Sequence, residues 1–136
     1  MRKPKRKHIL IADDDLVTIN MLEGVLKAGG FDVSIAADAM QAIMLAVRKP
    51  PDAIILDIGM PGGGGFQVLE RLKASTNPKL SKVPIIVLTG LTDPLLAGRV
   101  LGIGADEFFS KPVTPEKLRQ ALDRLLAPRV DDMAGS

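Results

Sequence analysis

The stretch Ile9-Leu10-Ile11-Ala12-Asp13-Asp14-Asp15 places an unbroken aliphatic run directly before three carboxylates. A continuous run of this kind is typical of a strand that is buried on both faces of a sheet. Apolar residues then recur at helical spacing from Leu16 to Leu26, with Asp15 as the expected N-cap and Gly29-Gly30 closing the helix. The first thirty residues therefore predict one strand and one helix with an acidic junction between them.

The same alternation repeats four more times along the chain. The further strands are expected at 32–36, 53–57, 83–88 with Thr89 at its tip, and 105–110. Helices are expected after Asp38 as N-cap, over 66–72, from Pro94, and from Thr114 as N-cap with Pro115 at the first helical position to near Pro128. Five units in a row favour an α/β fold: a flavodoxin-like, doubly wound parallel sheet of five strands in the order 2-1-3-4-5, with helices on both faces.

Glycine and proline mark the expected connections. The glycine-rich stretch 62–65 lacks the lysine and hydroxyl residues of a phosphate-binding loop, so we interpret it as a flexible turn. Asn77-Pro78 predicts a loop before the fourth strand. Gly98 and Gly102 weaken the fourth helix. These segments are predicted to connect the elements rather than to carry chemistry.

The composition indicates one globular domain with an aliphatic core. The chain has 136 residues, of which 46% are hydrophobic and 25% are charged, and it has no Trp or Tyr. It has no cysteine, which excludes disulfides and thiolate metal sites. We expect a basic leader over residues 1–7, the domain over 8–127, and a flexible tail over 128–136.

The formal net charge of +2 hides an uneven distribution. Five basic residues lie in the first seven positions, so the charge of +2 less these five leaves −3 for the remainder. That balance argues against a basic face for nucleic acid. The leader is interpreted as a solubilising segment, with a weak anionic tether as the alternative. No stretch has the length of a signal-peptide core or a membrane span, so we expect a cytoplasmic protein without a membrane partner.

Polar residues follow four of the five expected strands. The first strand is followed by Asp13-Asp14, the third ends in Asp57, the fourth in Thr89, and the fifth is followed by Lys111. In open α/β sheets, ligands bind at the carboxyl ends of the strands where the strand order reverses. These side chains are therefore expected to meet at one edge of the sheet.

This set of groups suits phosphoryl transfer. Neighbouring carboxylates repel one another unless a cation compensates, and Mg²⁺ prefers such oxygen ligands. Lys111 and Thr89 can contact phosphate oxygens, and an aspartate can act as the nucleophile that forms an aspartyl-phosphate. Taken singly, the aspartates could be helix caps, Thr89 a strand end, and Lys111 a solvated charge. Their joint placement at strand ends favours a functional site.

These residues make the sequence resemble the receiver domains of bacterial two-component response regulators. It is most similar in kind to the stand-alone receivers of chemotaxis. The resemblance covers about His8 to Leu126. It rests on four stretches: Ile9 to Asp15, Leu56-Asp57-Ile58-Gly59-Met60-Pro61 with Gly65 beyond it, Leu88-Thr89-Gly90, and Lys111-Pro112. Each is weak alone, but all four in order on the expected elements are specific.

The resemblance implies a role for each site residue. Asp57 would accept a phosphoryl group from a histidine kinase or a histidine phosphotransfer protein. Asp13 and Asp14 would hold Mg²⁺ together with Asp57 and the backbone carbonyl of Gly59. The chain would then be a phosphoacceptor switch in a phosphorelay and not an enzyme with an external substrate.

The resemblance also implies a conformational switch. Thr89 would move to bond the phosphoryl group, Lys111 would pair with it, and Phe108 would turn inward as the switch aromatic. The surface of the fourth helix, fifth strand and last helix would contact an unknown downstream protein. The bond from Lys111 to Pro112 is expected to be cis. Gly59 and Leu91 flank the phosphorylation site and predict slow loss of the phosphoryl group.

Two other classes of protein remain open at this point. The first is an aspartate-nucleophile phosphatase or phosphotransferase, although haloacid dehalogenase-like enzymes usually carry a second acid where this chain has Gly59. The second is a receiver fold that acts as an unphosphorylated interaction module. Modification of Asp57 by a small phosphodonor would distinguish the three.

Overall fold

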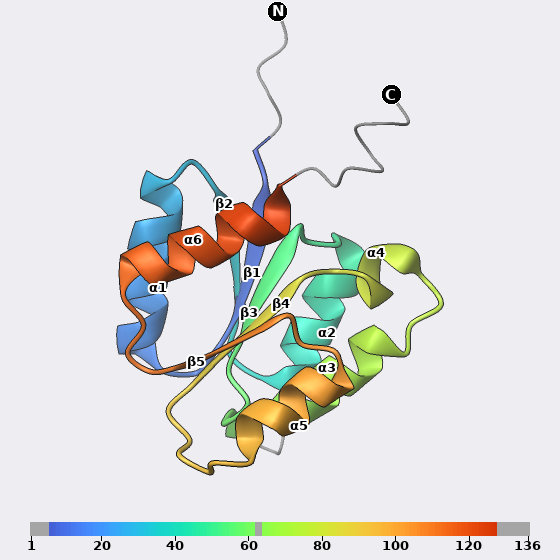
Figure 1. Cartoon of the computed structure of the whole chain (residues 1–136). Coiled ribbons are helices and arrows are strands. Elements are labelled where there is room, and N and C mark those ends of the chain that lie inside the picture. Colours follow the sequence, from blue (N-terminus) through green and yellow to red (C-terminus); the bar gives the residue numbers. More distant parts are fainter. Residues whose placement is uncertain (1–5, 62–63, 128–136) are drawn as a thin grey trace, which may run out of the picture.

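The structure, a computed structural model, describes residues 6–61 and 64–127. Within these residues the chain alternates strands and helices (Figure 1). The elements are β1 (His8–Ala12), α1 (Leu16–Ala28), β2 (Asp32–Ala36), α2 (Ala39–Arg48), β3 (Ala53–Leu56), α3 (Gly64–Lys73), α4 (Pro78–Ser81), β4 (Ile85–Thr89), α5 (Leu96–Ile103), β5 (Glu107–Ser110) and α6 (Pro115–Leu126).

The five strands form one parallel sheet in the order β2-β1-β3-β4-β5. Helices α1 and α6 cover one face, and α2, α3 and α5 cover the other (Figure 1). The predicted flavodoxin-like fold and strand order are therefore confirmed. The order reverses between β1 and β3, which pair directly with each other, so the residues that follow these two strands lie side by side.

The core is aliphatic and divided by the sheet into two layers. One layer packs Leu10, Ile54 and Ile85 of the strands against α2, α3 and α5. The other packs Ile9, Ile55 and Ile86 against α1 and α6. Neighbouring strand residues point to opposite faces, so a continuous apolar run fills both layers at once. This explains why β1, β3 and β4 read as unbroken hydrophobic stretches.

The predicted helix caps are confirmed at three helices. The side chains of Asp15, Asp38 and Thr114 accept hydrogen bonds from the backbone N–H groups of Val17, Gln41 and Lys117, respectively. Each bond satisfies a donor that would otherwise have no partner in the first turn.

The expectation that residues 62–65 form a flexible turn is wrong for its second half. Gly64 and Gly65 are buried and begin α3, while 62–63 lie outside the described residues. A Cβ at Gly65 would lie 2.6 Å from the carbonyl oxygen of Asp57, and one at Gly64 would lie 2.5 Å from the Cβ of Ala39. Gly65 is therefore required by close packing against the loop that carries Asp57, and Gly64 by close packing against the start of α2.

The expected loop at Asn77-Pro78 instead begins the short helix α4. The Asn77 side chain accepts from the N–H of Lys79, and Pro78 occupies the first helical turn, where its missing donor costs little. The ammonium of Lys73 then donates to the carbonyl oxygen of Val83 at 3.1 Å. This contact fixes the chain between α4 and β4.

Three predicted boundaries on the β4–β5 side differ by two residues. Strand β4 begins at Ile85 instead of Val83, because Pro84 has no N–H to give to the ladder. Helix α5 begins at Leu96 instead of Pro94, because Asp93 closes a turn by accepting the N–H of Leu95. Strand β5 begins at Glu107 instead of Ala105.

The late start of β5 follows from the way in which α5 ends. The N–H groups of Gly104 and Ala105 both donate to the carbonyl of Val100. Gly104 has φ +134, a backbone conformation that favours glycine. Ala105 is therefore used to close the helix and cannot pair in the sheet.

Of the four apolar residues expected to mark α2, only Ile43 packs against the core, and it is half-buried. Met40, Met44 and Val47 are exposed, whereas Ala42 and Ala46 are buried between α2 and the sheet. Small side chains allow this helix to pack closely against its neighbours.

No helix in the described part of the chain combines the length and the apolar character that a bilayer crossing needs. The expected tail at 128–136 and residues 1–5 of the expected leader lie outside the described residues. The domain boundaries proposed from the sequence therefore remain predictions.

Candidate functional site

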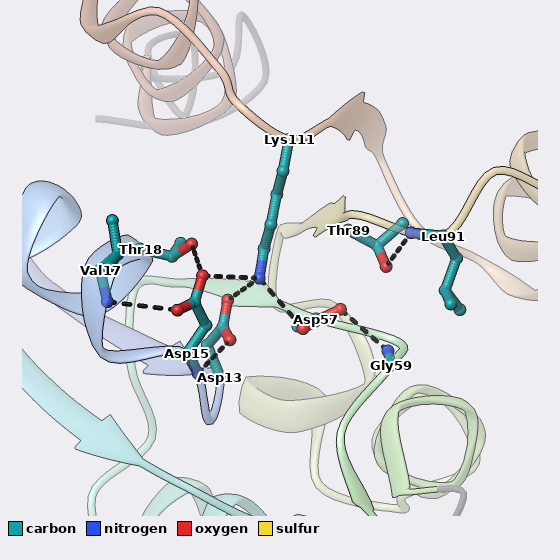
Figure 2. Close-up of polar contacts among 9 residues, drawn as sticks. All are labelled: Asp13, Asp15, Val17, Thr18, Asp57, Gly59, Thr89, Leu91 and Lys111. Atoms are coloured by element: carbon teal, nitrogen blue, oxygen red, sulfur yellow. Dashed lines mark hydrogen bonds and ion pairs between the residues drawn. The ribbon is translucent and has the colours of Figure 1, made fainter.

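The polar residues predicted to meet at the carboxyl ends of the strands do so. Figure 2 shows Lys111 reaching from the segment after β5 to Asp13 and Asp57, with Thr89 on the far side of Asp57. The side chains of Asp13 and Asp57 are buried, as is that of Thr89. Their elements are adjacent because β1 pairs with β3, and β3 pairs with β4.

Three carboxylates form a compact cluster. One oxygen atom from each of Asp13, Asp14 and Asp57 lies within 4.8 Å of the others. Asp14 is exposed and the other two are buried, so the cluster opens to solvent on one side. A set of hard oxygen donors at this spacing fits Mg²⁺, which uses one or two carboxylates and keeps several waters.

Lys111 supplies the positive charge within the cluster. Its Nζ lies 2.9 Å from Oδ2 of Asp13 and 3.2 Å from Oδ2 of Asp57. Its backbone N–H donates to the carbonyl oxygen of Thr89 at 2.8 Å, which anchors its stem. Burial acts to lower the pKa of Lys111, but the bond to Asp13 and the charge of Asp57 outweigh it and raise that pKa above its ordinary value. Lys111 is therefore held in its charged form.

In Asp13, unlike in Lys111, burial outweighs the hydrogen bonds in setting the pKa. Burial raises the pKa of this carboxyl group, and the charge of Asp57 adds to the rise, although the Asp15 N–H and Lys111 both act to lower it. The cluster therefore concentrates negative charge beyond what a single lysine neutralises. A divalent cation between the carboxylates would relieve this cost.

Asp15 was predicted only as a helix cap, and the structure adds a second contact. Its Oδ2 accepts a hydrogen bond from the hydroxyl of Thr18 at 2.6 Å and lies 3.9 Å from the Nζ of Lys111. The Thr18 bond, above all, lowers the pKa of Asp15. Asp15 thus extends the negative field around Lys111. Three acids in a row contain no signal that would have separated this role from capping.

Both oxygens of Asp57 have partners. Oδ1 accepts from the backbone N–H of Gly59 at 2.8 Å, and Oδ2 accepts from Lys111. Gly59 itself is exposed and carries no side chain, so the position beside Asp57 is open; a Cβ there would lie 3.4 Å from Oδ1 and 3.6 Å from Cγ of Leu91. Gly59 and Leu91 therefore face each other beside the carboxylate.

Thr89 and Phe108, which the sequence predicts to be a switch pair, lie on the neighbouring strands β4 and β5. The fully buried hydroxyl oxygen of Thr89 accepts from the N–H of Leu91 at 3.3 Å. Phe108 lies on β5 opposite Val87 of β4 and packs, half-buried, against the core beneath α5. The peptide bond from Lys111 to Pro112 is cis, as predicted.

The chain is similar to known proteins over most of its length. The family described as "Response regulator receiver domain" matches residues 9–123. The DNA-binding response regulator MtrA of Mycolicibacterium paratuberculosis is 37% identical over 113 residues, which cover 83% of this chain and 48% of that protein. The chain thus spans about half the length of the MtrA relatives that it matches.

Solved structures show the same fold. Chemotaxis response regulator CheY4 of Vibrio cholerae matches with a TM-score of 0.80 and 30% identity, covering 90% of this chain and all of that one. A CheY-like response regulator receiver domain protein of Methanospirillum hungatei matches with a TM-score of 0.83 and 25% identity, covering 97% of this chain and 100% of that chain.

Proposed function

Because the chain belongs to the response regulator receiver domain family and so serves in two-component phosphorelay signalling, we propose that Asp57 is its phosphoryl acceptor. The single observation that carries this proposal is the position of Asp57, buried at the end of β3 between Lys111 and the N–H of Gly59. Thr89 and Lys111 would assist the transfer.

Asp13, Asp14 and Asp57 would hold a Mg²⁺ ion, joined by the backbone carbonyl of Gly59. The clustering of the three carboxylates supports this assignment. When bound, the ion would neutralise negative charge that develops on the transferred group. The mixture of buried and exposed ligands suits an ion that keeps part of its water shell.

The transfer step uses one oxygen of Asp57. This oxygen forms a bond to phosphorus while the bond from phosphorus to the donor breaks, which leaves an aspartyl-phosphate and the free donor. Lys111 already bridges Asp13 and Asp57, and its flexible stem allows its Nζ to follow an oxygen of the incoming phosphoryl group. The donor would be a histidine kinase or a histidine phosphotransfer protein.

Phosphorylation would shift a two-state equilibrium through Thr89. Its hydroxyl oxygen accepts from the N–H of Leu91, and its hydroxyl hydrogen could be donated to a phosphoryl oxygen on Asp57. Such a shift requires contacts that differ between the two states, and a new hydrogen bond from Thr89 would be one of them. Phe108 would then turn inward beside Thr89.

The output surface is proposed to be formed by α5, β5 and α6. Thr89 leads directly into the segment before α5, and Lys111 follows β5, so both phosphate-contacting residues are joined to this surface. The downstream partner is a protein that recognises its altered shape. The chain would catalyse only its own phosphorylation and dephosphorylation. We also propose that it acts in the cytoplasm, as expected from the sequence.

Modification by a small phosphodonor tests the acceptor. In the presence of Mg²⁺, acetyl phosphate should add one phosphoryl group per chain, measured by intact mass. Asp57→Asn should abolish the addition, because the isosteric amide is a poor nucleophile. The matched control Asp123→Ala removes an exposed carboxylate from α6 and should modify normally. A chelator should suppress modification of the parent chain.

The same experiment distinguishes the two alternatives. Continued release of inorganic phosphate from phosphoesters would identify a phosphatase. A parent chain that stays unmodified by acetyl phosphate, although it is folded and supplied with Mg²⁺, would contradict the phosphoacceptor assignment and favour an interaction module.

A further inference from the structure

A cleft of about 670 Å³ lies at the opposite end of the sheet from the carboxylate cluster. It is bounded by the start of β1, the segment after α2, and α4, which Figure 1 shows at the end of the sheet where β1 enters. Its volume is in the range of small-molecule sites. No part of the phosphoacceptor site borders it.

Six cationic side chains from three segments line this cleft, which we call the basic cleft. They are Arg6 and Lys7 before β1, Arg48 and Lys49 at the end of α2, and Lys79 and Lys82 at α4. Only two acidic residues, Asp32 and Asp52, line it as well, so the lining carries an excess of four positive charges. The formal net charge of the whole chain, +2, does not reveal this local concentration of positive charge.

The six cations are available to a ligand. All are exposed, and within 6–61 and 64–127 none of them forms an ion pair. The carboxylate of Asp52 is engaged by the backbone, because its Oδ2 accepts the N–H of His8 at 2.7 Å. Uncompensated like charges held close together repel one another, and a bound anion would relieve that repulsion.

The wall of the basic cleft is held by the backbone. The N–H of Asp32 donates to the carbonyl of Lys7 at 2.9 Å, and the N–H of Asp52 donates to that of His8 at 2.7 Å. These bonds tie the starts of β1, β2 and β3 together. This side of the basic cleft is therefore fixed, so a ligand there would lose little binding energy in ordering the backbone.

His8 lies in this wall, and its pKa depends on its burial and on the positive charge of the basic cleft. It is 8% exposed, its Nε2 lies 2.6 Å from Oγ of Ser34, and its Nδ1 has no hydrogen-bond partner. Burial lowers the pKa of His8 and the charge of Lys49 lowers it further, against the opposing charges of Asp52 and Asp32. An anion held beside Lys49 would reverse part of that shift.

We propose that the basic cleft binds a compact oligophosphate, a small ligand with several adjacent phosphate groups. Ammonium and guanidinium groups from three segments of the chain match the dense charge of such a ligand, in which each phosphate is anionic at neutral pH. This binding site is independent of Asp57 and of phosphorylation.

The lining favours this ligand over two larger polyanions. Pro50, Pro51, Pro78 and Pro84 border the cleft and have no N–H groups to pair with an acidic peptide backbone. None of the described residues that line it is Phe, Tyr or Trp, so bases of a nucleic acid strand would find no stacking surface. Recognition must therefore come from the cations alone.

Proton NMR of His8 tests the proposal directly, because His8 is the only histidine of the chain and gives one imidazole signal to follow. Tripolyphosphate, titrated into the full chain at 150 mM salt, should shift this signal saturably and raise the pKa of His8. Lys79→Gln with Lys82→Gln should weaken the dissociation constant about tenfold or more, as expected from the loss of two charge-assisted contacts. The matched control Lys117→Gln with Arg119→Gln removes the same charge from exposed positions of α6 and should bind like the parent.

Three results would overturn the proposal. Equal weakening in the two double variants would mean that only overall charge matters. A linear, unsaturated shift would mean that there is no site. Tighter binding of a single-stranded oligonucleotide than of tripolyphosphate would assign the cleft to nucleic acid.

Discussion

At the residue scale, Lys111 does more than pair with a phosphate. Two buried carboxylates lie within 3.2 Å of its Nζ, so in the absence of a metal ion it is the nearest compensating charge. Lys111→Met keeps most of the side-chain volume and removes that charge. We expect it to lower the free energy of unfolding by about 2 kcal/mol, because it leaves buried acids without their cation.

Urea unfolding without divalent cations would measure this loss. Lys117→Met is the control, because Lys117 is exposed on α6 and makes no ion pair within the described residues. Added Mg²⁺ should restore part of the stability of Lys111→Met by supplying a positive charge to the same carboxylates. A variant as stable as the parent chain would show that the cluster needs no compensation.

Gly59 is the residue at which the lifetime of the phosphoryl group can be altered. Neither Gly59 nor Leu91 offers a polar side chain to orient an attacking water, so we expect slow hydrolysis of the aspartyl-phosphate. Gly59→Asn would place a carboxamide beside Oδ1 of Asp57 and should speed the loss of the phosphoryl group several-fold.

Decay of the phosphorylated mass after removal of the donor gives this rate. Gly59→Ala adds the Cβ without the amide and should decay like the parent chain. If the parent loses its phosphoryl group faster than Gly59→Asn does, the explanation from side-chain polarity is wrong.

At the scale of elements, the start of α3 depends on close packing that only glycine permits. A Cβ at Gly65 would overlap the backbone of Ile58 and the carbonyl of Asp57. Gly65→Ala should therefore cost about 2 kcal/mol or more, since overpacking displaces the backbone. It should also slow phosphorylation, because the displaced loop carries the acceptor.

The matched substitution lies in α5, where a Cβ at Gly98 would meet nothing within 4 Å. Gly98→Ala should stabilise the protein by about 0.5–1 kcal/mol through helix propensity alone. Thermal and urea unfolding of the two variants would compare them directly. A loss of stability in both would indicate that the close approach at Gly65 is not the cause.

The sequence predicted elements well where their signals are local. The caps Asp15, Asp38 and Thr114 are confirmed, because a capping bond joins residues two or three apart. The roles of Gly64 and Gly65 were missed because their partners, Ala39 and the Asp57 loop, belong to other elements. The late start of β5 was missed because Ala105 is needed by the end of α5.

At the scale of the whole molecule, one buried histidine should make stability depend on pH. Burial lowers the pKa of His8 in the folded chain below its ordinary value of 6.5. Between these two pKa values the unfolded chain binds more protons, so the free energy of unfolding falls as the pH decreases from 6.5 through the folded pKa.

The slope from one such group is at most about 1.4 kcal/mol per pH unit. Urea unfolding between pH 7.5 and 5.5 should show this slope in the parent chain, and His8→Gln, which has no group titrating there, should lack it. The carboxylates are the same in the parent chain and in His8→Gln, so they change the free energy of unfolding equally in both. Parallel pH profiles for the two chains would show that the pKa of His8 is the same in the folded and unfolded states.

The sheet order and the meeting of Asp13, Asp14, Asp57, Thr89 and Lys111 could be predicted because parallel strands align their carboxyl ends at one edge. The basic cleft could not. Its cations come from three segments separated by loops, and no motif marks them. Local patterns identify groups that end successive strands, whereas clusters assembled from loops and helix ends require the folded positions.

Phe108 is a suitable position for a fluorescent probe of the proposed switch. It packs half-buried against the core, on the strand that adjoins Thr89. Since the protein has neither Trp nor Tyr, an indole introduced by Phe108→Trp would be the only fluorophore excited at 295 nm. Its emission wavelength would report rotation of the ring in real time and without background, from the same cuvette in which acetyl phosphate is mixed.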